Sequence, residues 1–194
     1  MQTEYRSQFP PQVATLKNGR RLTLRLLAED DAEALGDFYE SMPRETWRFY
    51  CPPKLTRQDA AEKAARALSP TLVCLVAVDE TTGQIAGYDW YQWDDEESRA
   101  SVFGICVREA YRGIGLGRAL IQRLLEIAHG RVHGRIRARK IGPPVMSLTV
   151  QLANPRAVAL YTKMGFRIVR EQIREQVADF PAEPEYYMEQ IVRE

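Results

Sequence analysis

The stretch VREAYRGIGLGR, residues 107–118, decides the fold, because it joins a strand-like run to an amphipathic helix through a glycine-rich turn. Gly113, Gly115 and Gly117 let the backbone approach a ligand without clashes from Cβ atoms. Successive N–H groups at a helix start, with the positive end of the helix dipole, offer hydrogen-bond donors to phosphate oxygens. The stretch therefore predicts a pyrophosphate-binding loop for a nucleotide-like cofactor.

The residues around this loop exclude two other phosphate-binding motifs. A dinucleotide-binding fingerprint needs glycine or alanine where Arg118 stands and an acidic residue about 20 positions later, where this chain carries the basic segment 131–140. A P-loop ends in Gly-Lys-Ser/Thr, which is absent. The remaining pattern is Arg-x-x-Gly-x-Gly/Ala, formed by Arg112, Gly115 and Gly117, and it resembles the acetyl-CoA loop of the GCN5-related N-acetyltransferases (GNAT).

A second motif, NPRAVALYTKMGF at residues 154–166, resembles the same family's signature at every fixed position. Its local chemistry is consistent with a helix, because Asn154 can cap it, Pro155 suits the first helical position and Gly165 suits the position just past its end. The two motifs occur in the order found in the family. The glycine-rich stretch at 107–118 is therefore better explained as a cofactor loop than as an ordinary turn.

The resemblance covers nearly the whole chain and implies a mixed α/β GNAT fold, with a central, mostly antiparallel twisted sheet of about seven strands flanked by four helices. It also implies an N-terminal arm at 1–12 and a single N-acetyltransferase domain at 13–194. The pattern predicts a hairpin around Asn18-Gly19, helices over 30–39, 56–68 and up to 129, and strands over 72–78, 84–93, 100–107, 145–150, 167–177 and 186–192. The faces that we expect to be buried carry Ala60, Ala61, Ala64, Ala65 and Leu68 on one helix, and Leu116, Leu120, Leu124 and Ile127 on another.

The resemblance also implies the roles of site residues. Tyr161 is the candidate general acid for the CoA sulfur, and Asn154 either contacts the cofactor arm or only caps its helix. Backbone groups that pair with the pantetheine arm and the thioester carbonyl belong to Ile105, Cys106 and Val107, and a bulge at Gly104 is expected to free them. The loop residues assigned to cofactor binding are Arg112, Gly113, Ile114, Gly115, Leu116, Gly117 and Arg118.

The general base stays open at this stage. The acceptor amine must lose a proton before it attacks, so a base or a chain of waters is required. The strand before the loop contains no acidic residue, and the candidates are Asp89, Glu96, Glu97 and a water relay.

Two classes of function are considered: an acetyl-CoA-dependent N-acetyltransferase, and a non-catalytic module that senses acetyl-CoA. Tyr161 favours the enzyme, because a sensor does not need a proton donor at the sulfur. Residues 15–25 and 45–56 resemble the acetyltransferase domain of bacterial and archaeal protein-lysine acetyltransferases, which suggests a protein lysine as the acceptor. A small-molecule amine is the alternative, and a homodimer is left open.

Composition and charge indicate which partners, metals and compartments are expected for the protein. The 194 residues carry a formal net charge of +1, which gives no sign of nucleic-acid binding. Cys51, Cys74 and Cys106 lack paired or metal-ligand spacing, so we expect reduced thiols, no metal and a cytoplasmic protein. No apolar window is long enough to predict a membrane span, and the basic segment 131–140 is expected to be a solvated loop.

Overall fold

The structure is a computed structural model that describes residues 7–49, 55–95, 97–132, 135–136, 141–177 and 179–192. The mixed α/β prediction is confirmed. The elements follow one another as β1 (Gln12–Thr15), β2 (Arg21–Leu26), η1 (Glu29–Asp31), α2 (Ala32–Glu40), α3 (Arg44–Trp47), α4 (Arg57–Ala65), β3 (Leu72–Asp79), β4 (Ile85–Gln92), β5 (Ala100–Val107), η2 (Glu109–Tyr111), α5 (Leu116–Ala128), β6 (Arg131–Val132), β7 (Arg135–Ile136), β8 (Val145–Gln151), α6 (Pro155–Lys163), β9 (Arg167–Arg174) and β10 (Glu183–Ile191).

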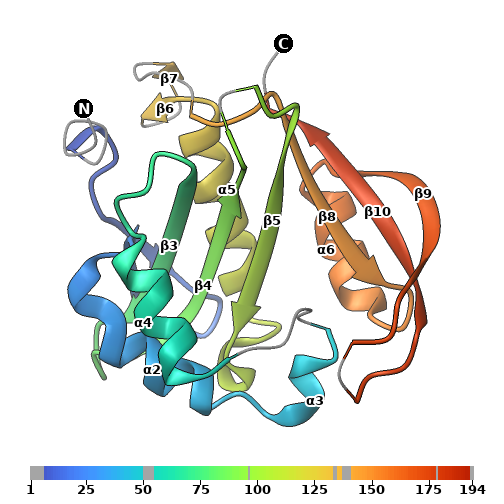
Figure 1. Ribbon diagram of the computed structural model, residues 1–194. Helices are drawn as coiled ribbons and strands as arrows, with labels where there is room; N and C mark the ends of the chain where they lie inside the picture. The colour runs from blue at the N-terminus through green and yellow to red at the C-terminus, as the bar shows by residue number, and fades with distance from the viewer. Residues whose placement is uncertain are drawn as a thin grey trace.

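The main sheet of the described residues has eight strands in the order β1-β2-β3-β4-β5-β8-β10-β9. Every neighbouring pair is antiparallel except β5 and β8, which are parallel. Figure 1 shows α2, α3 and α4 on the face toward the viewer and α5 and α6 on the opposite face. We call these the front and back faces of the sheet.

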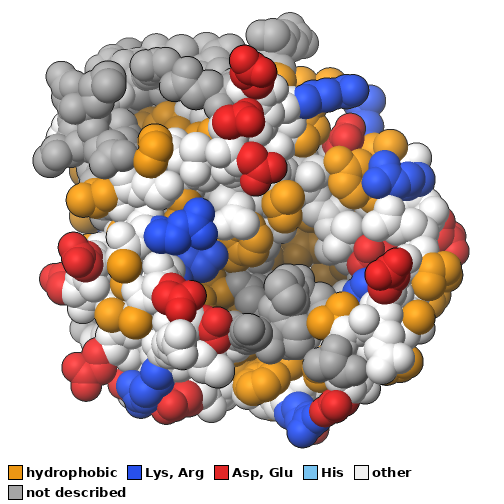
Figure 2. Space-filling model, viewed as in Figure 1, with side chains coloured by type: hydrophobic (Ala, Val, Ile, Leu, Met, Phe, Trp, Pro, Cys, Tyr) orange, Lys and Arg blue, Asp and Glu red, His pale blue; other side chains and the backbone are white. Residues whose placement is uncertain are grey.

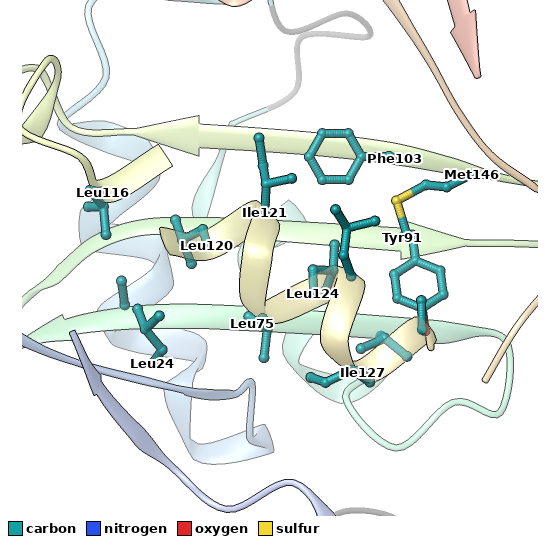
Figure 3. Packing of buried hydrophobic residues seen from close by; sticks show 14 of the residues in the cluster. Leu24, Leu75, Tyr91, Phe103, Leu116, Leu120, Ile121, Leu124, Ile127 and Met146 are labelled. Atoms are coloured by element: carbon teal, nitrogen blue, oxygen red, sulfur yellow. The ribbon is translucent and has the colours of Figure 1, made fainter. Parts of the chain in front are cut away.

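The back face holds the larger hydrophobic cluster, which is built around α5. The four residues expected on the buried side of this helix, Leu116, Leu120, Leu124 and Ile127, are all 0% exposed, so that prediction is confirmed. Figure 3 shows them against the side chains of the central strands. Because each fully buried leucine or isoleucine contributes about 1.5–3 kcal/mol, this contact fixes α5, and with it the glycine-rich loop, on the sheet.

The front face is covered by α2 and α4. Helix α4 begins with the expected capping box, in which the Thr56 side chain accepts a hydrogen bond from the Asp59 amide at 3.2 Å. The expected buried side of α4 is wrong in part, because Ala60 and Ala64 are buried but Ala61 and Ala65 are exposed and Leu68 is 45% exposed. The reason is that the helix ends at Ala65, so Leu68 no longer follows the helical period.

The remaining differences concern short elements. Helix α3 was not expected, and the sheet gains a strand because β1 and β2 both pair within it. The hairpin that joins them turns at Gly19, whose φ is +82°, as the Asn-Gly pair predicts. In the basic segment 131–140, β6 and β7 form a two-stranded sheet of their own where a loop was expected.

Candidate functional site

An open strand edge lies in the middle of the sheet, between β5 and β8. The two strands pair only from Ala100 with Val145 to Val102 with Ser147, whereas β5 stays paired with β4 up to Val107. The rest of β5 therefore has no strand partner on its β8 side within the described residues, and Figure 1 shows the two strands diverging there. Backbone N–H and C=O groups on such an edge can pair with an extended ligand.

The glycine-rich loop lies at the end of this open edge. Gly113 and Gly115 have φ values of +76° and +108°, which favour glycine, and Gly115 is the N-cap of α5. The first backbone hydrogen bond of the helix joins the Ala119 amide to the Gly115 carbonyl at 3.1 Å. The amides from Gly113 to Arg118 have no acceptor among the described residues, and the first turn carries no acidic side chain. This donor set fits a pyrophosphate.

Two side chains hold the loop in place. The Tyr111 hydroxyl donates to the buried Asp79 carboxylate at 2.7 Å, which ties the loop to the end of β3 and keeps the pKa of Asp79 below its ordinary value. Arg112 donates from Nε to the Val107 carbonyl at 3.0 Å and from Nη2 to Thr46 Oγ1 at 2.9 Å. Arg112 therefore connects the end of β5 to α3.

The three β5 residues expected to bind the cofactor arm lie at the open edge. Ile105 and Val107 are half-buried against the back cluster, and Cys106 points to the front cluster. Burial raises the pKa of the Cys106 thiol to about 12, so it is a protonated packing group.

The expected bulge at Gly104 is wrong, because the register of β5 with β4 is continuous through this residue. The open edge results instead from the divergence of β8. Glycine is needed at position 104 for another reason: a Cβ there would lie 2.7 Å from Cζ2 of Trp90 on the neighbouring strand.

Tyr161 lies on α6 beside the point where the strands part. Its ring packs edge-on against Phe103 on β5 with centroids 6.0 Å apart, and against Phe166 at 5.9 Å. Burial raises the pKa of the Tyr161 phenol, and the nearby Cys106 and Asp89 raise it further. The hydroxyl is therefore protonated at neutral pH and can act as a proton donor.

Asn154 caps α6. Its Oδ1 accepts a hydrogen bond from the Ala157 amide at 3.2 Å, and Pro155 occupies the first helical position. The half-buried apolar side of the helix, including Tyr161, faces the back cluster. The capping role that the sequence suggested is thus present, and contact with a cofactor stays a prediction.

The structure separates the candidates for the general base. Asp89 is 0% exposed, neither carboxylate oxygen has a hydrogen-bond partner among the described residues, and burial raises its pKa well above the ordinary value. With no exposed surface and no hydrogen-bond partner, this carboxyl has no contact through which it could take a proton from an acceptor amine. Glu97 is exposed in the β4–β5 turn, next to the end of β5 that pairs with β8 and therefore away from the open edge. Glu96 lies outside the described residues.

Sequence reasoning missed the group of side chains that joins α3 to the β9–β10 hairpin. Arg48, just after α3, donates to both oxygens of the Glu183 carboxylate at 2.8 Å. Arg174 lies 3.4 Å from the same carboxylate and donates to the Arg48 carbonyl at 3.0 Å, and Arg44 pairs with Asp179. No local pattern signals the contacts of Arg44 and Arg48, because their partners lie more than 120 residues away along the chain.

Helix α3 therefore bridges the open end of the gap between β5 and β8, with Arg112 on one side and Glu183 on the other. Figure 1 shows it at the end of the gap, between β5 and the hairpin. Figure 2 shows the front face hollowed near its centre, with hydrophobic side chains at the bottom of the hollow. A small molecule entering from the front would thus meet the exposed side of the open edge.

The described residues contain no group of His, Cys, Asp and Glu side chains that could hold a metal ion. Cys74 and Cys106 are buried free thiols, and Cys51 lies outside the described residues. Within the part of the chain that the structure describes, no helix is both long enough and apolar enough to cross a membrane.

Comparison with known proteins agrees with this geometry. The model of the acetyltransferase (GNAT) family matches residues 32–166. Mycothiol acetyltransferase from Propionibacterium freudenreichii is 30% identical over 121 residues, which cover 61% of this chain and 35% of that protein. The L-methionine sulfoximine/L-methionine sulfone acetyltransferase of Pseudomonas paraeruginosa is 33% identical over 113 residues, covering 58% of this chain and 59% of that protein. In both cases the match spans less than two thirds of the relative.

A solved structure has the same fold with a cofactor bound. YncA from Salmonella typhimurium, solved with acetyl-CoA, superposes with a TM-score of 0.68 at 21% identity, covering 89% of this chain and 95% of that one. The family match extends from α2 to the end of the second motif and includes the open edge and the glycine-rich loop. The chain therefore belongs to the acetyltransferase (GNAT) family, an enzyme family whose acetyl donor is acetyl-CoA.

Proposed function

We propose that the protein transfers the acetyl group of acetyl-CoA to a primary amine of a small molecule by direct attack on the thioester. The observation that carries this proposal is the open edge of β5 with the protonated Tyr161 hydroxyl beside it. The free amides from Gly113 to Arg118 supply the pyrophosphate site at the end of that edge. Ile105, Cys106 and Val107 lie where an extended pantetheine arm would pair.

The chemistry assigns a simple sequence of bond changes to these groups. The neutral amine nitrogen forms a bond to the thioester carbon, the carbon–sulfur bond breaks, and Tyr161 gives its proton to the leaving sulfur. The amine loses its proton to water on the front face, because Asp89 is fully enclosed and Glu97 lies in the turn before the paired end of β5. Tyr161 regains a proton from the same solvent.

Two observations favour a small acceptor over a protein lysine. Helix α3 is held at both ends of the entrance, by Arg112 at one side and by the Arg48–Glu183 pair at the other, which leaves a hollow rather than an open groove. The names of the two relatives described above are those of enzymes for small molecules, mycothiol and methionine sulfoximine or sulfone. A protein-lysine acceptor, suggested by residues 45–56, is the competing outcome of the test.

The test is mass spectrometry of a panel of diamines, amino acids, aminoglycosides and lysine peptides after incubation with the enzyme and acetyl-CoA. We expect the acetyl adduct on at least one small amine. Acetylation of the peptides alone would replace this proposal with the protein-lysine one. Binding of acetyl-CoA without any transfer would favour the sensing module.

The cofactor site has a separate test. Gly115→Asp places a side chain and a negative charge at a residue with φ of +108°, where the phosphates are expected. Isothermal titration calorimetry should show acetyl-CoA binding to the wild type and none to this variant. Gly19→Asp, at the exposed β1–β2 turn with φ of +82°, is the matched control and should bind normally. Equal affinity of Gly115→Asp and the wild type would refute the assignment.

A further inference from the structure

The turn between β1 and β2 contacts the glycine-rich loop, although about 100 residues separate them in the chain. The Lys17 backbone amide donates a hydrogen bond to the Ile114 carbonyl at 3.1 Å. The Arg20 guanidinium lies over the Tyr111 ring, 4.9 Å from its centroid. The buried Leu16 belongs to the same hydrophobic cluster as Tyr111, and Ile114 packs against this cluster. The β1–β2 turn is therefore fixed against the loop by a hydrogen bond, a cation–π contact and apolar packing.

The hydrogen bond from Lys17 fixes the direction of one peptide group of the loop. A trans peptide group is planar, so the N–H of Gly115 points away from the side to which the C=O of Ile114 points. Because this carbonyl points to the β1–β2 turn, the Gly115 amide points to the opposite side of the loop. It has no acceptor among the described residues, and an unbonded amide at a helix start is available to an anion.

We propose that the Lys17 backbone amide is a positioning group of the cofactor site, which holds the Gly115 amide toward the pyrophosphate of acetyl-CoA. This inference rests on the proposed function, because it requires the pyrophosphate to bind at the glycine-rich loop. Glycines give a loop many conformations, and a loop that is oriented before the ligand arrives loses less entropy on binding. The bond from Lys17 therefore raises the affinity for acetyl-CoA without contacting it.

The side chain of Lys17 has to be separated from its backbone amide in any test. The ammonium group is exposed, and an exposed cation attracts phosphates through the solvent. The amide acts differently, because it orients a neighbouring peptide group and carries no net charge. A useful pair of variants therefore removes the ammonium group in both proteins and the N–H in only one.

The geometry of the β1–β2 turn allows the N–H to be removed without disturbing the backbone. The Gly19 amide donates to the Leu16 carbonyl at 2.9 Å, and the φ of Gly19 is +82°. These features are those of a type I turn followed by a left-handed residue, in which Lys17 is the first central residue. Proline is favoured at this position, because the turn requires a φ close to the value that the ring imposes. Lys17→Pro therefore deletes the N–H and keeps the turn.

The experiment compares Lys17→Pro with Lys17→Ala by isothermal titration calorimetry with acetyl-CoA. We expect the affinity of Lys17→Pro to be about 10- to 100-fold below that of Lys17→Ala, the usual range for one hydrogen bond to a charged group. Urea unfolding should give similar stabilities, because the gain from proline in a compatible turn offsets the lost hydrogen bond. Equal acetyl-CoA affinities of the two variants would overturn the inference.

A measurement on the wild type tests the same inference without any substitution. Hydrogen exchange of the Lys17 amide, followed by NMR, should slow when acetyl-CoA is added, because a ligand on the Gly115 amide holds the peptide group whose carbonyl bonds to Lys17. The Gly19 amide is bonded within the turn and is the matched reference, which should change less. Unchanged exchange at Lys17 in the saturated protein would contradict the inference, whatever the stability of the variants.

The outcomes distinguish this inference from the proposed function. If the wild type binds acetyl-CoA and transfers the acetyl group but the two Lys17 variants bind alike, only the inference fails. If the wild type does not bind acetyl-CoA, both fail. Gly19→Asp keeps the Lys17 amide in place, because aspartate is among the residues that adopt positive φ most readily, so normal binding by that variant agrees with both.

Discussion

Replacing Asp89 by asparagine should change how the stability of the protein depends on pH. The carboxyl is fully buried on β4 with no hydrogen-bond partner among the described residues, and burial raises its pKa well above its ordinary value. In the unfolded chain the group ionises near its ordinary pKa. Between these two pKa values the folded state therefore holds one proton that the unfolded state has lost.

The sign and size of the effect follow from this proton. A group whose pKa is raised on folding stabilises the protein fully below its unfolded pKa, and this contribution is lost as the pH rises toward the folded pKa. The free energy of unfolding should thus fall by about 1.4 kcal/mol per pH unit because of Asp89 alone. Asparagine does not titrate, so Asp89→Asn should gain stability relative to the wild type at that rate until the pH reaches the folded-state pKa of Asp89.

The assay is urea unfolding of both proteins at half-unit pH steps from 4 to 8, compared as the difference in unfolding free energy. Other titrating groups cancel in this difference, and the steric effect of the amide adds a constant offset. The difference should rise linearly and level off at the folded-state pKa of Asp89. A flat line for Asp89→Asn would refute the reasoning and return Asp89 to the candidates for the general base.

Three further substitutions test the packing and the chemistry of the site. Gly104→Ala should cost about 1–3 kcal/mol in urea unfolding, because its Cβ would lie 2.7 Å from Trp90, and unchanged stability would show that the indole moves freely. Tyr161→Phe should lower kcat roughly 10- to 1000-fold in a CoA-release assay with little change in acetyl-CoA affinity, and an unchanged kcat would assign the leaving-group proton to water. Tyr111→Phe should lower the unfolding free energy by about 1–3 kcal/mol, because Asp79 loses a hydrogen bond of 2.7 Å, and equal stability by thermal unfolding would contradict this account.

The cofactor half of the site could be predicted from the sequence because its determinants are local. Positive φ at Gly113 and Gly115, the cap at Asn154 and the apolar stripe of α5 each depend on residues close together in the chain. The bounds of β5, Ala100–Val107, were predicted correctly for the same reason, because the strand ends where the glycine-rich loop begins.

The acceptor half could not be predicted, since it depends on partners that the chain brings together from a distance. Arg48 meets Glu183 across 135 positions, and nothing in either segment identifies the other. Asp89 illustrates the same limit, because a lone acidic residue in a strand does not reveal whether its carboxyl faces solvent or the core. Glu97 was a candidate for the general base, yet Asp95 accepts hydrogen bonds from the Glu97 amide and the Ser98 hydroxyl, as in an ordinary solvated turn.

The order of the elements explains why the cofactor site is built from one continuous segment, whereas the acceptor side is built from segments far apart in the chain. Joining two parallel neighbouring strands requires a crossover connection, and here the crossover helix is α5 between β5 and β8. A helix that follows β5 must begin at the end of that strand, which is where β8 has diverged, so the phosphate site and the open edge arise together from one continuous segment. The front face receives no crossover helix, and its walls come from α3, which contacts the cofactor loop through Thr46 and Arg112, and from the final hairpin. Acceptor specificity should therefore be altered by substitutions in the final hairpin that leave acetyl-CoA affinity, measured by calorimetry, unchanged.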